Sequence, residues 1–221
     1  MPKLISSEGS IAAGKSTLIS ILEGKNYEDL IILKEPVDEW LKIQDSNKKS
    51  LFEHFYEDKK KYGFSLQIYA LFTRFKLLAE SFEIAEKWEI KNPGREMKIL
   101  AERTILSDFK IFASLLHEEG IIEELNFQIY KSWFEYFSEK YKIDKIIYLK
   151  TDPKICFDRI KTRDRDGEDN IESDYLNKIH QKHEDMIKEC ECEILILQNE
   201  NNIDSLEYDE IIKKSIEFIF S

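Results

Sequence analysis

Apolar side chains along the chain gather into short runs that alternate with longer amphipathic stretches. The short runs have the length and composition of strands, and they cover residues 4–7, 30–33, 97–101, 145–149 and 193–197. The longer stretches repeat apolar residues at helical spacing over 64–90, 105–116, 121–140, 153–163, 173–189 and 208–220. Because strands and helices alternate, the pattern predicts right-handed crossovers and an α/β fold with a five-stranded parallel sheet.

Local signals mark some of the boundaries between these elements. Residues 151–153 (Thr-Asp-Pro) form a helix start, with a capping side chain followed by proline in the first turn. Residues 92–94 (Asn-Pro-Gly) are typical of a turn between a helix and a strand. The chain has no internal repeat and no low-complexity linker, so we expect residues 1–221 to form a single domain. Ligands of open parallel sheets bind beyond the carboxyl ends of the strands, which directs attention to the residues there.

The end of the first strand carries an open loop, in a chain that otherwise uses glycine sparingly. Two of the seven glycines fall within the stretch EGSIAAGKST, which fits the pattern G-x-x-x-x-G-K-[ST]. In such a P-loop the glycines let backbone N–H groups turn inward and hold a polyphosphate. The lysine reaches the β- and γ-phosphates, the serine hydroxyl can ligate Mg²⁺, and the helix N-terminus that follows attracts anions. The predicted phosphate-binding residues of this loop are Gly9, Ala12, Ala13, Gly14, Lys15, Ser16 and Thr17.

Carboxylates follow the next two strands. Glu35 stands directly before Pro36, which favours an extended conformation, so its side chain can project toward the P-loop. Glu102 and Arg103 follow the third strand, and Asp108 comes a helical turn later. Taken alone, such residues are more often solvated or paired with an opposite charge. Their position beside a P-loop favours a functional site.

Arginines cluster in the stretch 159–168. Arg159 and Arg163 share a helix face, and Arg165 follows in a polar loop. Because each arginine has an acidic neighbour, a solvated and salt-bridged surface would also explain the cluster. In a protein with a P-loop we favour a lid over the phosphates, at about residues 159–170.

Composition narrows the possible partners. The 221 residues carry a net charge of −11, which argues against nucleic acid, because polyanion binding needs a basic surface. Cys156, Cys190 and Cys192 lack paired metal-ligand spacing, so we expect reduced thiols. No apolar leader precedes the P-loop, and no apolar run approaches the roughly 18 residues that span a bilayer. We therefore expect a cytoplasmic protein with no membrane partner.

The motifs resemble, in order, those of the deoxyribonucleoside kinase family. The resemblance is carried by EGSIAAGKST, KEPVDEW, FSLQIYALFTR and AERTILSDFKIFA, and then by RIKTRDRDGE followed by DYLNKIHQKHE. It runs from Lys3 to about Glu189 and is closest to the deoxycytidine, deoxyguanosine and deoxyadenosine kinase branch. It implies a P-loop kinase fold with an arginine-rich lid, and an enzyme that phosphorylates the 5′-hydroxyl of a deoxyribonucleoside in nucleotide salvage. It also implies Mg²⁺ as cofactor and ATP or another nucleoside triphosphate as phosphate donor.

The resemblance implies a role for each matching residue near the phosphates. Glu35 matches the general base, which must lie within hydrogen-bond reach of the weakly nucleophilic hydroxyl. Arg103 matches the arginine that holds both the 5′-oxygen and this base, and Glu102 matches the carboxylate that helps to fix Mg²⁺ together with Ser16. Phosphoryl transfer depends mainly on positioning and electrostatics. Charge on the transferred group would be neutralised by Lys15, Arg159, Arg163 and Arg165.

The resemblance also implies a nucleoside pocket. Tyr56 and Glu168 resemble the pair that binds the sugar 3′-hydroxyl. Gln67 resembles the amide that reads the base edge, and Phe112 would stack on the base. The aromatic side chains could equally be core residues. The implied substrate-binding residues are Glu35, Trp40, Tyr56, Gln67, Arg74, Arg103, Asp108, Phe112 and Glu168.

Arg74 and Asp108 bear on the choice of base. An ionised Asp only accepts hydrogen bonds and Arg only donates them, which suits a base with an exocyclic amine, such as cytosine or adenine. The O4 acceptor of thymine is disfavoured at Asp108, and guanine fits with its O6 facing Arg74. Family members that accept thymidine tend to have apolar residues at both positions. We therefore expect deoxyadenosine, deoxyguanosine or deoxycytidine to be preferred over thymidine.

The sequence departs from the family pattern at three places. Leu66 stands where many members have an aromatic residue, which leaves the choice between purine and pyrimidine open. Thr104 replaces a serine but keeps the hydroxyl. The loop near 198–204, which contacts the donor base in the family, matches poorly, so the donor also stays open. By resemblance we expect a homodimer that pairs through the helices at roughly 64–90 and 105–116.

Alternative functions fit parts of the sequence less well. A nucleoside monophosphate kinase, such as a thymidylate kinase, shares the fold, but the carboxylate of Glu35 would repel its phosphorylated acceptor. Residues 164–167 fit the D-x-x-G of a GTPase-like switch, but they follow an arginine-rich helix, and no N-K-x-D motif occurs. His180 and His183 share a helix face that could bind zinc, but a third ligand is missing. A non-catalytic protein is disfavoured because Lys15 and Glu35 are both present.

Overall fold

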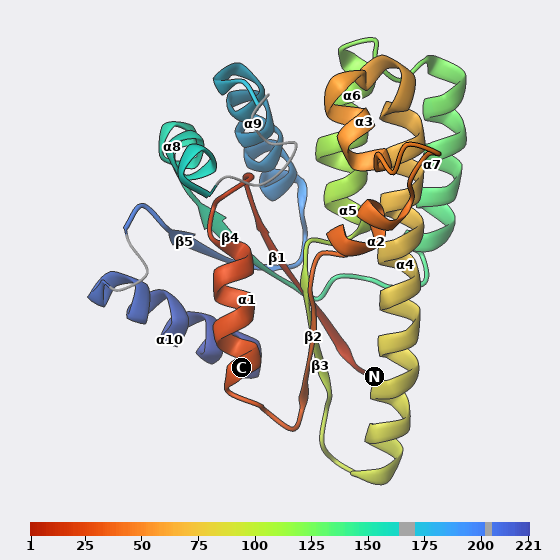
Figure 1. Cartoon of the computed structure of the whole chain (residues 1–221). Helices are drawn as coiled ribbons and strands as arrows, with labels where there is room; N and C mark the ends of the chain where they lie inside the picture. Colours follow the sequence, from red (N-terminus) through yellow and green to blue (C-terminus); the bar gives the residue numbers. More distant parts are fainter. Residues whose placement is uncertain (164–170, 202–204) are drawn as a thin grey trace.

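The computed structural model describes residues 1–163, 171–201 and 205–221, and its centre is a five-stranded sheet (Figure 1). All strands pair in parallel, in the order β2-β3-β1-β4-β5. This arrangement confirms the predicted α/β fold, and the predicted strands agree closely with the observed ones. The strands are β1 (Lys3–Gly9), β2 (Leu30–Leu33), β3 (Lys98–Glu102), β4 (Lys145–Lys150) and β5 (Glu193–Gln198).

Helices connect the strands where the apolar spacing predicts them, with two additions and one change of form. The additions are two short helices between β2 and the longest helix. The change is a π-helical segment, η1, within the helix predicted over 105–116, where the turn is wider than in an α-helix. The helices are α1 (Lys15–Gly24), α2 (Val37–Lys42), α3 (Leu51–Glu57), α4 (Lys59–Lys91), α5 (Ile105–Ser107), η1 (Asp108–Ala113), α6 (Ser114–Glu118), α7 (Glu124–Ser138), α8 (Pro153–Arg163), α9 (Ser173–Glu189) and α10 (Leu206–Phe220).

Helices cover both faces of the sheet, because successive side chains of each strand point to opposite faces. On one face, Ile5 and Leu100 belong to a core that includes residues of α1 and α10. On the other face, Leu4 and Ile99 belong to a core that includes residues of α4 and α7. Figure 1 shows these two helix layers on either side of the sheet. Burial on both sides explains why β3 and β4 appear in the sequence as nearly continuous apolar runs.

Side-chain caps explain where several helices begin. Ser50 and Glu53 form a capping box at the start of α3, and Asp58 accepts a hydrogen bond from the backbone of Lys61 at the start of α4. At the predicted start of α8, Asp152 accepts a hydrogen bond from the backbone N–H two residues on. Both of these helices carry residues of the cleft described below.

Large apolar side chains reach the surface mainly along α4 and α7. On α7 they recur every three or four residues, as one stripe of a helix does. The exposed residues are Leu125, Ile129, Trp133 and Tyr136 on α7, and Phe72, Ile84 and Ile90 on α4. In the segment predicted as a helix over 105–116, by contrast, Ile105, Ile111, Leu115 and Leu116 are buried within the chain. Among the helices described, none has both the length and the apolar character that crossing a membrane requires.

Candidate active site

The P-loop joins β1 to α1 and surrounds the ammonium group of Lys15. Lys15 Nζ donates hydrogen bonds to the backbone carbonyls of Gly9, at 3.2 Å, and Ser10, at 2.8 Å, and the side chain is buried. Gly14 has a φ of 98°, and an added Cβ there would overlap the side-chain amide of Asn199, so the turn requires glycine. The loop therefore holds a cation at the carboxyl end of β1, where an anionic ligand can meet it.

Lys15 titrates close to neutral pH. Burial lowers its pKa, and the positive charge of Arg103 lowers it further, while Glu102, Glu35 and Glu8 act in the opposite direction. The resulting pKa is about 8. The ammonium group is therefore charged at pH 7 and begins to lose its proton about one pH unit higher.

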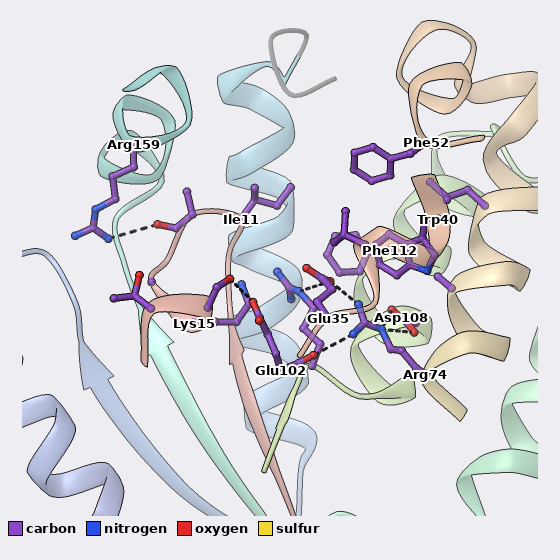
Figure 2. A pocket seen from close by; sticks show the side chains of 18 of the residues that line it. Ile11, Lys15, Glu35, Trp40, Phe52, Arg74, Glu102, Asp108, Phe112 and Arg159 are labelled. Carbon is purple, nitrogen blue, oxygen red and sulfur yellow. Dashed lines mark hydrogen bonds and ion pairs between the residues drawn. The ribbon is translucent and has the colours of Figure 1, made fainter. Parts of the chain in front are cut away.

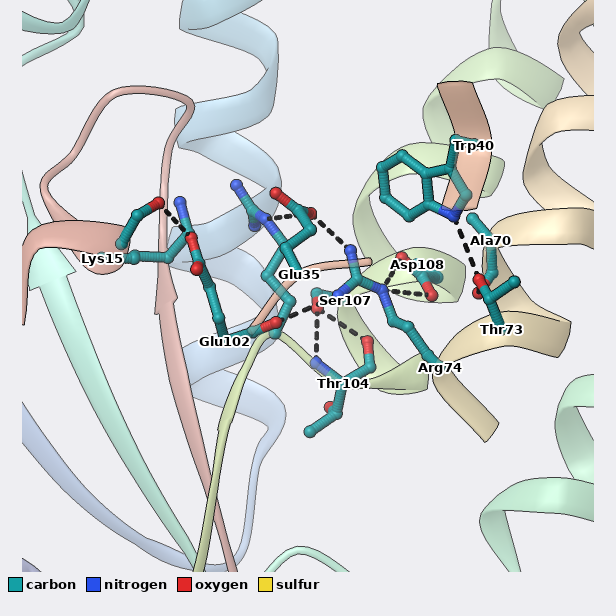
Figure 3. Close-up of polar contacts among 12 residues, drawn as sticks. Lys15, Glu35, Trp40, Ala70, Thr73, Arg74, Glu102, Thr104, Ser107 and Asp108 are labelled. Carbon is teal, nitrogen blue, oxygen red and sulfur yellow. Dashed lines mark hydrogen bonds and ion pairs between the residues drawn. The ribbon is translucent and has the colours of Figure 1, made fainter. Parts of the chain in front are cut away.

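The carboxylate of Glu35 lies beyond the end of β2, between two arginines. Arg74 Nη2 donates a 2.5 Å hydrogen bond to Glu35 Oε1 (Figure 3), and Arg103 Nε lies 3.7 Å from the same oxygen. Burial raises the pKa of Glu35, but the charges of Arg74, Arg103 and Lys15 outweigh it and bring the pKa to about 2. Glu35 is therefore an ionised carboxylate at neutral pH.

Arg74 joins this carboxylate to a second one, that of Asp108. Arg74 Nε lies 3.0 Å from Asp108 Oδ1 and 2.9 Å from Oδ2, and Nη1 donates to the backbone carbonyl of Glu102 at 3.0 Å (Figure 3). Burial raises the pKa of Asp108 to about 6 despite the charge of Arg74, so Asp108 is ionised above that pH. The structure thus pairs Arg74 with Asp108 and, in addition, ties the pair to Glu35.

Two oxygen ligands suitable for a divalent cation lie beside the P-loop. Ser16 Oγ donates a 2.6 Å hydrogen bond to Glu102 Oε1. Mg²⁺ prefers oxygen ligands and is usually bound by one or two carboxylates together with substrate phosphates. A hydroxyl and a carboxylate next to a phosphate-binding loop fit that chemistry. Within 1–163, 171–201 and 205–221, no three or more His, Cys, Asp or Glu side chains are grouped as a metal site.

These groups line one cleft of about 360 Å³, a volume typical of small-molecule sites (Figure 2). Figure 2 shows Lys15 and Glu102 on one side of Glu35, and Arg74 and Asp108 on the other. The predicted pocket residues that line the cleft are Glu35, Trp40, Tyr56, Gln67, Arg74, Arg103, Asp108 and Phe112. The predicted phosphate-binding residues that line it are Ala12, Gly14, Lys15, Ser16, Thr17 and Arg159, whereas Gly9 and Ala13 belong to the loop but not to the cleft wall.

The end of the cleft far from the P-loop contains two buried hydrogen-bond acceptors. Gln67 Oε1 accepts no hydrogen bond from any described residue, and neither does Asp108 Oδ2, which is in ion-pair contact with Arg74 Nε at 2.9 Å. The ring of Trp40 lines this end of the cleft, and its Nε1 donates a 3.0 Å hydrogen bond to Thr73 Oγ1 (Figure 3). A buried acceptor without a partner is energetically costly, and a ligand N–H would remove that cost.

Part of the predicted lid lies outside the described residues. This holds for Arg165, for Glu168 and for the D-x-x-G stretch at 164–167, while the side chain of Arg163 is also not described. Arg159 is described: its Nη1 lies 3.5 Å from the carbonyl oxygen of Ala12, and its Nη2 donates to that of Asn201 at 3.0 Å. Arg159 therefore connects the P-loop to the segment that follows β5.

Sequence reasoning missed several residues of the cleft wall. Asn199 follows β5, and its Nδ2 donates a 2.6 Å hydrogen bond to the carbonyl of Ala13 in the P-loop. The position of Asn199 just beyond the fifth strand is the signal that identifies it, because ligands of parallel sheets gather at the strand ends. Phe52, Phe55 and Tyr175 also line the cleft, and no sequence signal separates them from core aromatics.

Comparison with known proteins places these motifs in one family. Residues 5–220 match the sequence model of the deoxynucleoside kinases. The chain belongs to the deoxynucleoside kinase family. A probable deoxycytidine kinase of fowlpox virus is 37% identical over 189 residues, which cover 85% of this chain and 72% of the relative. Human deoxycytidine kinase is 33% identical over 198 residues (82% and 74%), and a mitochondrial deoxyguanosine kinase of Xenopus laevis is 29% identical over 215 residues (91% and 78%).

Family membership confirms the resemblance and gives this kinase its reaction class, the phosphorylation of a deoxynucleoside with a nucleotide as phosphate donor. It favours a nucleoside kinase over a nucleoside monophosphate kinase or a GTPase-like switch. Of the two histidines considered for zinc, His183 has both ring nitrogens in contact with protein atoms. His183 is buried, its Nδ1 lies 2.8 Å from the carbonyl oxygen of Ile179, and its Nε2 lies 3.2 Å from Arg103 Nη1.

Proposed function

We propose that this kinase transfers the γ-phosphoryl group of a nucleoside triphosphate to the 5′-hydroxyl of a deoxynucleoside, with Glu35 as the general base. The observation that carries the proposal is that the Glu35 carboxylate lies in the same cleft as Lys15 and Ser16 of the P-loop. A nucleoside with its base at the Trp40 end would present its 5′-hydroxyl between Glu35 and the phosphates. An uncharged hydroxyl is the acceptor that a carboxylate can approach without repulsion.

Glu35 would mainly orient the hydroxyl and accept its proton late in the reaction. A carboxylate with a pKa of about 2 is a weak base. Phosphoryl transfer through a loose transition state requires little proton removal before the bond to the leaving group breaks, so alignment matters more than basicity. Arg103, whose Nε is 3.7 Å from Glu35 Oε1, would hold the 5′-oxygen and the carboxylate together.

The phosphate end would be held by cations and backbone N–H groups of the P-loop. Lys15 would contact the β- and γ-phosphates, and Arg159 would approach them from α8, with Arg163 and Arg165 of the lid proposed for the same task. Ser16 and Glu102 would hold Mg²⁺, which when bound neutralises charge on the phosphates. ATP is the donor that we propose to test first.

The base end supports a base with an exocyclic amine. Gln67 Oε1 is a buried acceptor without a hydrogen-bond partner among the described residues, and Asp108 Oδ2, although 2.9 Å from Arg74 Nε, accepts no hydrogen bond either. The amine of cytosine, adenine or guanine supplies N–H donors for such acceptors. Thymine would place a second acceptor, O4, against them. The relatives named as deoxycytidine and deoxyguanosine kinases support the same selection. We propose that Phe112 stacks on the base, and that Tyr56 and Glu168 bind the 3′-hydroxyl.

We also propose that this kinase forms a homodimer through α4 and α7. The helix α7 exposes an apolar stripe with Trp133 at its centre, and α4 exposes further large apolar side chains. Surfaces of this kind mark protein contacts. The helix predicted over 105–116 is a poorer choice for the second interface helix, because its large aliphatic residues are packed inside the chain.

Two further proposals concern the chain as a whole. Residues from both of its ends, such as Ile5 and Ile219, share one apolar core, which supports a single domain over 1–221. Its three cysteines are unpaired, although Cys190 and Cys192 are near neighbours. Free thiols are typical of a reducing compartment such as the cytoplasm.

A phosphate-transfer assay tests the proposed function. The purified kinase is supplied with ATP, Mg²⁺ and each of the four deoxynucleosides in turn, and kcat/KM is compared. We expect deoxycytidine, deoxyadenosine or deoxyguanosine to exceed thymidine. Glu35→Gln should still bind ATP while kcat falls by about 10²- to 10⁴-fold. Thymidine as the best substrate would contradict the base selection, and unchanged turnover of Glu35→Gln would remove Glu35 from its role.

A further inference from the structure

His183 lies in the interior of the protein and has no part in the proposed reaction so far. It lies on α9 and has no exposed surface. Its Nδ1 is 2.8 Å from the backbone carbonyl oxygen of Ile179, which can only accept a hydrogen bond, so the proton must be on Nδ1. Its Nε2 is 3.2 Å from Arg103 Nη1, and a guanidinium can only donate, so Nε2 must be the acceptor. The two contacts therefore specify one neutral tautomer, with both ring nitrogens used.

The surroundings keep this imidazole neutral and fix its plane. Burial, and then the charge of Arg103, lower the pKa of His183 well below its usual value, with smaller effects of Lys15 and His180 in the same direction. The ring of Tyr148 stacks beside it, with the two planes 10° apart and the centroids 5.9 Å apart. Tyr148 is itself held by a 2.8 Å hydrogen bond from its hydroxyl to Glu184, the residue after His183.

Arg103 has an unusual backbone conformation and a buried guanidinium with few close polar contacts. Its backbone has a φ of 63°, in the left-handed region that residues other than glycine rarely adopt. Its closest polar side-chain contact in the described part of the chain is His183, while the nearest carboxylate oxygens, of Glu8 and Glu35, are both 3.7 Å away. The ring of Phe112 lies 4.9 Å from the guanidinium carbon. The guanidinium thus lies between two carboxylates, and His183 provides its directional hydrogen bond.

We propose that His183 is a positioning residue, which holds the Arg103 guanidinium at the distance and angle from which it reaches Glu35 and the reacting 5′-hydroxyl. This inference rests on the proposed function, because it acts through the role assigned to Arg103. A neutral acceptor is suited to the task, since it fixes one N–H of the guanidinium without forming an ion pair. Glu8, on the far side of the guanidinium, would otherwise compete with Glu35 for the same cation.

Two matched substitutions separate this role from simple packing. In His183→Asn the shorter amide can still donate to the Ile179 carbonyl but cannot reach Arg103. In His183→Gln the longer amide oxygen can reach Arg103 and accept its hydrogen bond. We expect His183→Asn to lower kcat by roughly 10- to 100-fold with the KM for ATP little changed, and His183→Gln to restore most of the loss. His180→Leu, on the same helix, serves as the control and should leave kcat unchanged.

A double-mutant cycle with Arg103→Leu tests whether the effect passes through the arginine. If it does, His183→Asn causes no further loss of kcat in the Arg103→Leu background. The positioning role is overturned if His183→Asn lowers kcat equally in the wild-type and Arg103→Leu backgrounds. It is also overturned if His183→Asn and His183→Gln lower kcat equally. If Arg103→Leu alone retains full kcat, the role of Arg103 in the proposed function fails instead, which distinguishes the two failures.

A measurement on the unmodified kinase avoids any effect of substitution on folding. Nitrogen-15 NMR of the histidine-labelled enzyme reports the protonation of each ring nitrogen. We expect a neutral His183 with the proton on Nδ1 and an unprotonated Nε2, unchanged from pH 8 to pH 6. A proton on Nε2 would overturn the proposal, because Arg103 would then have no acceptor there.

Discussion

Arg74 donates a 2.5 Å hydrogen bond to Glu35 while its Nε remains paired with Asp108. A single guanidinium therefore joins the residue proposed to read the base to the carboxylate proposed to orient the 5′-hydroxyl. Both partners of Arg74 are charged at neutral pH, and the arginine is buried, so the connection is strong and poorly screened by salt. The base pocket and the reaction centre should respond together to changes at this residue.

The first prediction concerns the charge that Arg74 supplies to Glu35. In Arg74→Gln the carboxylate loses its closest cation, so its pKa should rise from about 2 by roughly one to three units. In its proposed role Glu35 acts only as a carboxylate, and the acid limb of kcat at saturating nucleoside should therefore move to higher pH. Lys76→Gln removes an exposed charge from the same helix and should leave the limb in place. Coincident pH profiles for Arg74→Gln and the wild type would contradict the prediction.

A second prediction concerns the Arg74–Asp108 pair and thymidine. Asp108→Ala alone leaves a buried guanidinium partly unpaired and should reduce the free energy of unfolding by about 3 kcal/mol. Arg74→Met combined with Asp108→Ala removes both charges and should recover much of that stability. It should also raise kcat/KM for thymidine relative to deoxycytidine, because the polar groups that disfavour O4 are gone. Urea unfolding and the four-substrate assay measure the two effects, and a double variant that still rejects thymidine would place selectivity elsewhere.

Lys15 provides a third prediction, at alkaline pH. Its pKa of about 8 means that the ammonium is charged below pH 8 and neutral above it. The affinity for ATP should therefore fall by up to about tenfold per pH unit above pH 8. Lys15→Arg keeps its charge at every accessible pH and should show no such slope, even if its affinity is lower throughout. Titration calorimetry between pH 7 and pH 9.5 gives both curves, and parallel curves would exclude Lys15 as the titrating group.

The fourth prediction concerns assembly. Trp133 is half exposed in the middle of the α7 stripe, so Trp133→Glu should place a charge in the proposed interface and produce monomers. Leu206→Glu changes an even more exposed apolar residue, at the start of α10, and is the matched control. Light scattering coupled to gel filtration gives the mass of each variant. Dimers of Trp133→Glu, or monomers of the wild type, would contradict an interface on α7.

Much of the fold could be predicted because its signals are local. The run at 30–33 reads as a strand from its apolar content alone, and α8 and α9 have the predicted bounds. The helices α2 and α3 were missed because six or seven residues are too few for helical periodicity to stand out. The capping box at Ser50 and Glu53 was the available signal for α3. The π turn has no signal of its own, because a single wider turn barely disturbs an apolar repeat of 3.6 residues.

The candidate site was less predictable where it depends on long-range contacts. The P-loop and Glu35 follow from short motifs and strand ends. The contact of Arg74 with Glu35 joins the middle of α4 to the end of β2, 39 residues apart, and no local pattern encodes which of several carboxylates an arginine will meet. The same applies to His183, whose partner is 80 residues away. A resemblance identified the residues, but only the packing of α4 and α9 shows which of them touch.

The wide turn of η1 limits how the thermal stability of this kinase can be increased. Asp108 and Phe112, at the end of the cleft proposed for the base, both lie on this turn, and π turns are much rarer than α turns. The contact between Asp108 and Arg74 holds this turn from outside, in addition to its own backbone hydrogen bonds. A variant selected for heat resistance would gain from tightening this segment into a regular helix. The shape of the cleft around Asp108 and Phe112 would then change. Thermal stability and substrate selectivity therefore make opposing demands on the same six residues.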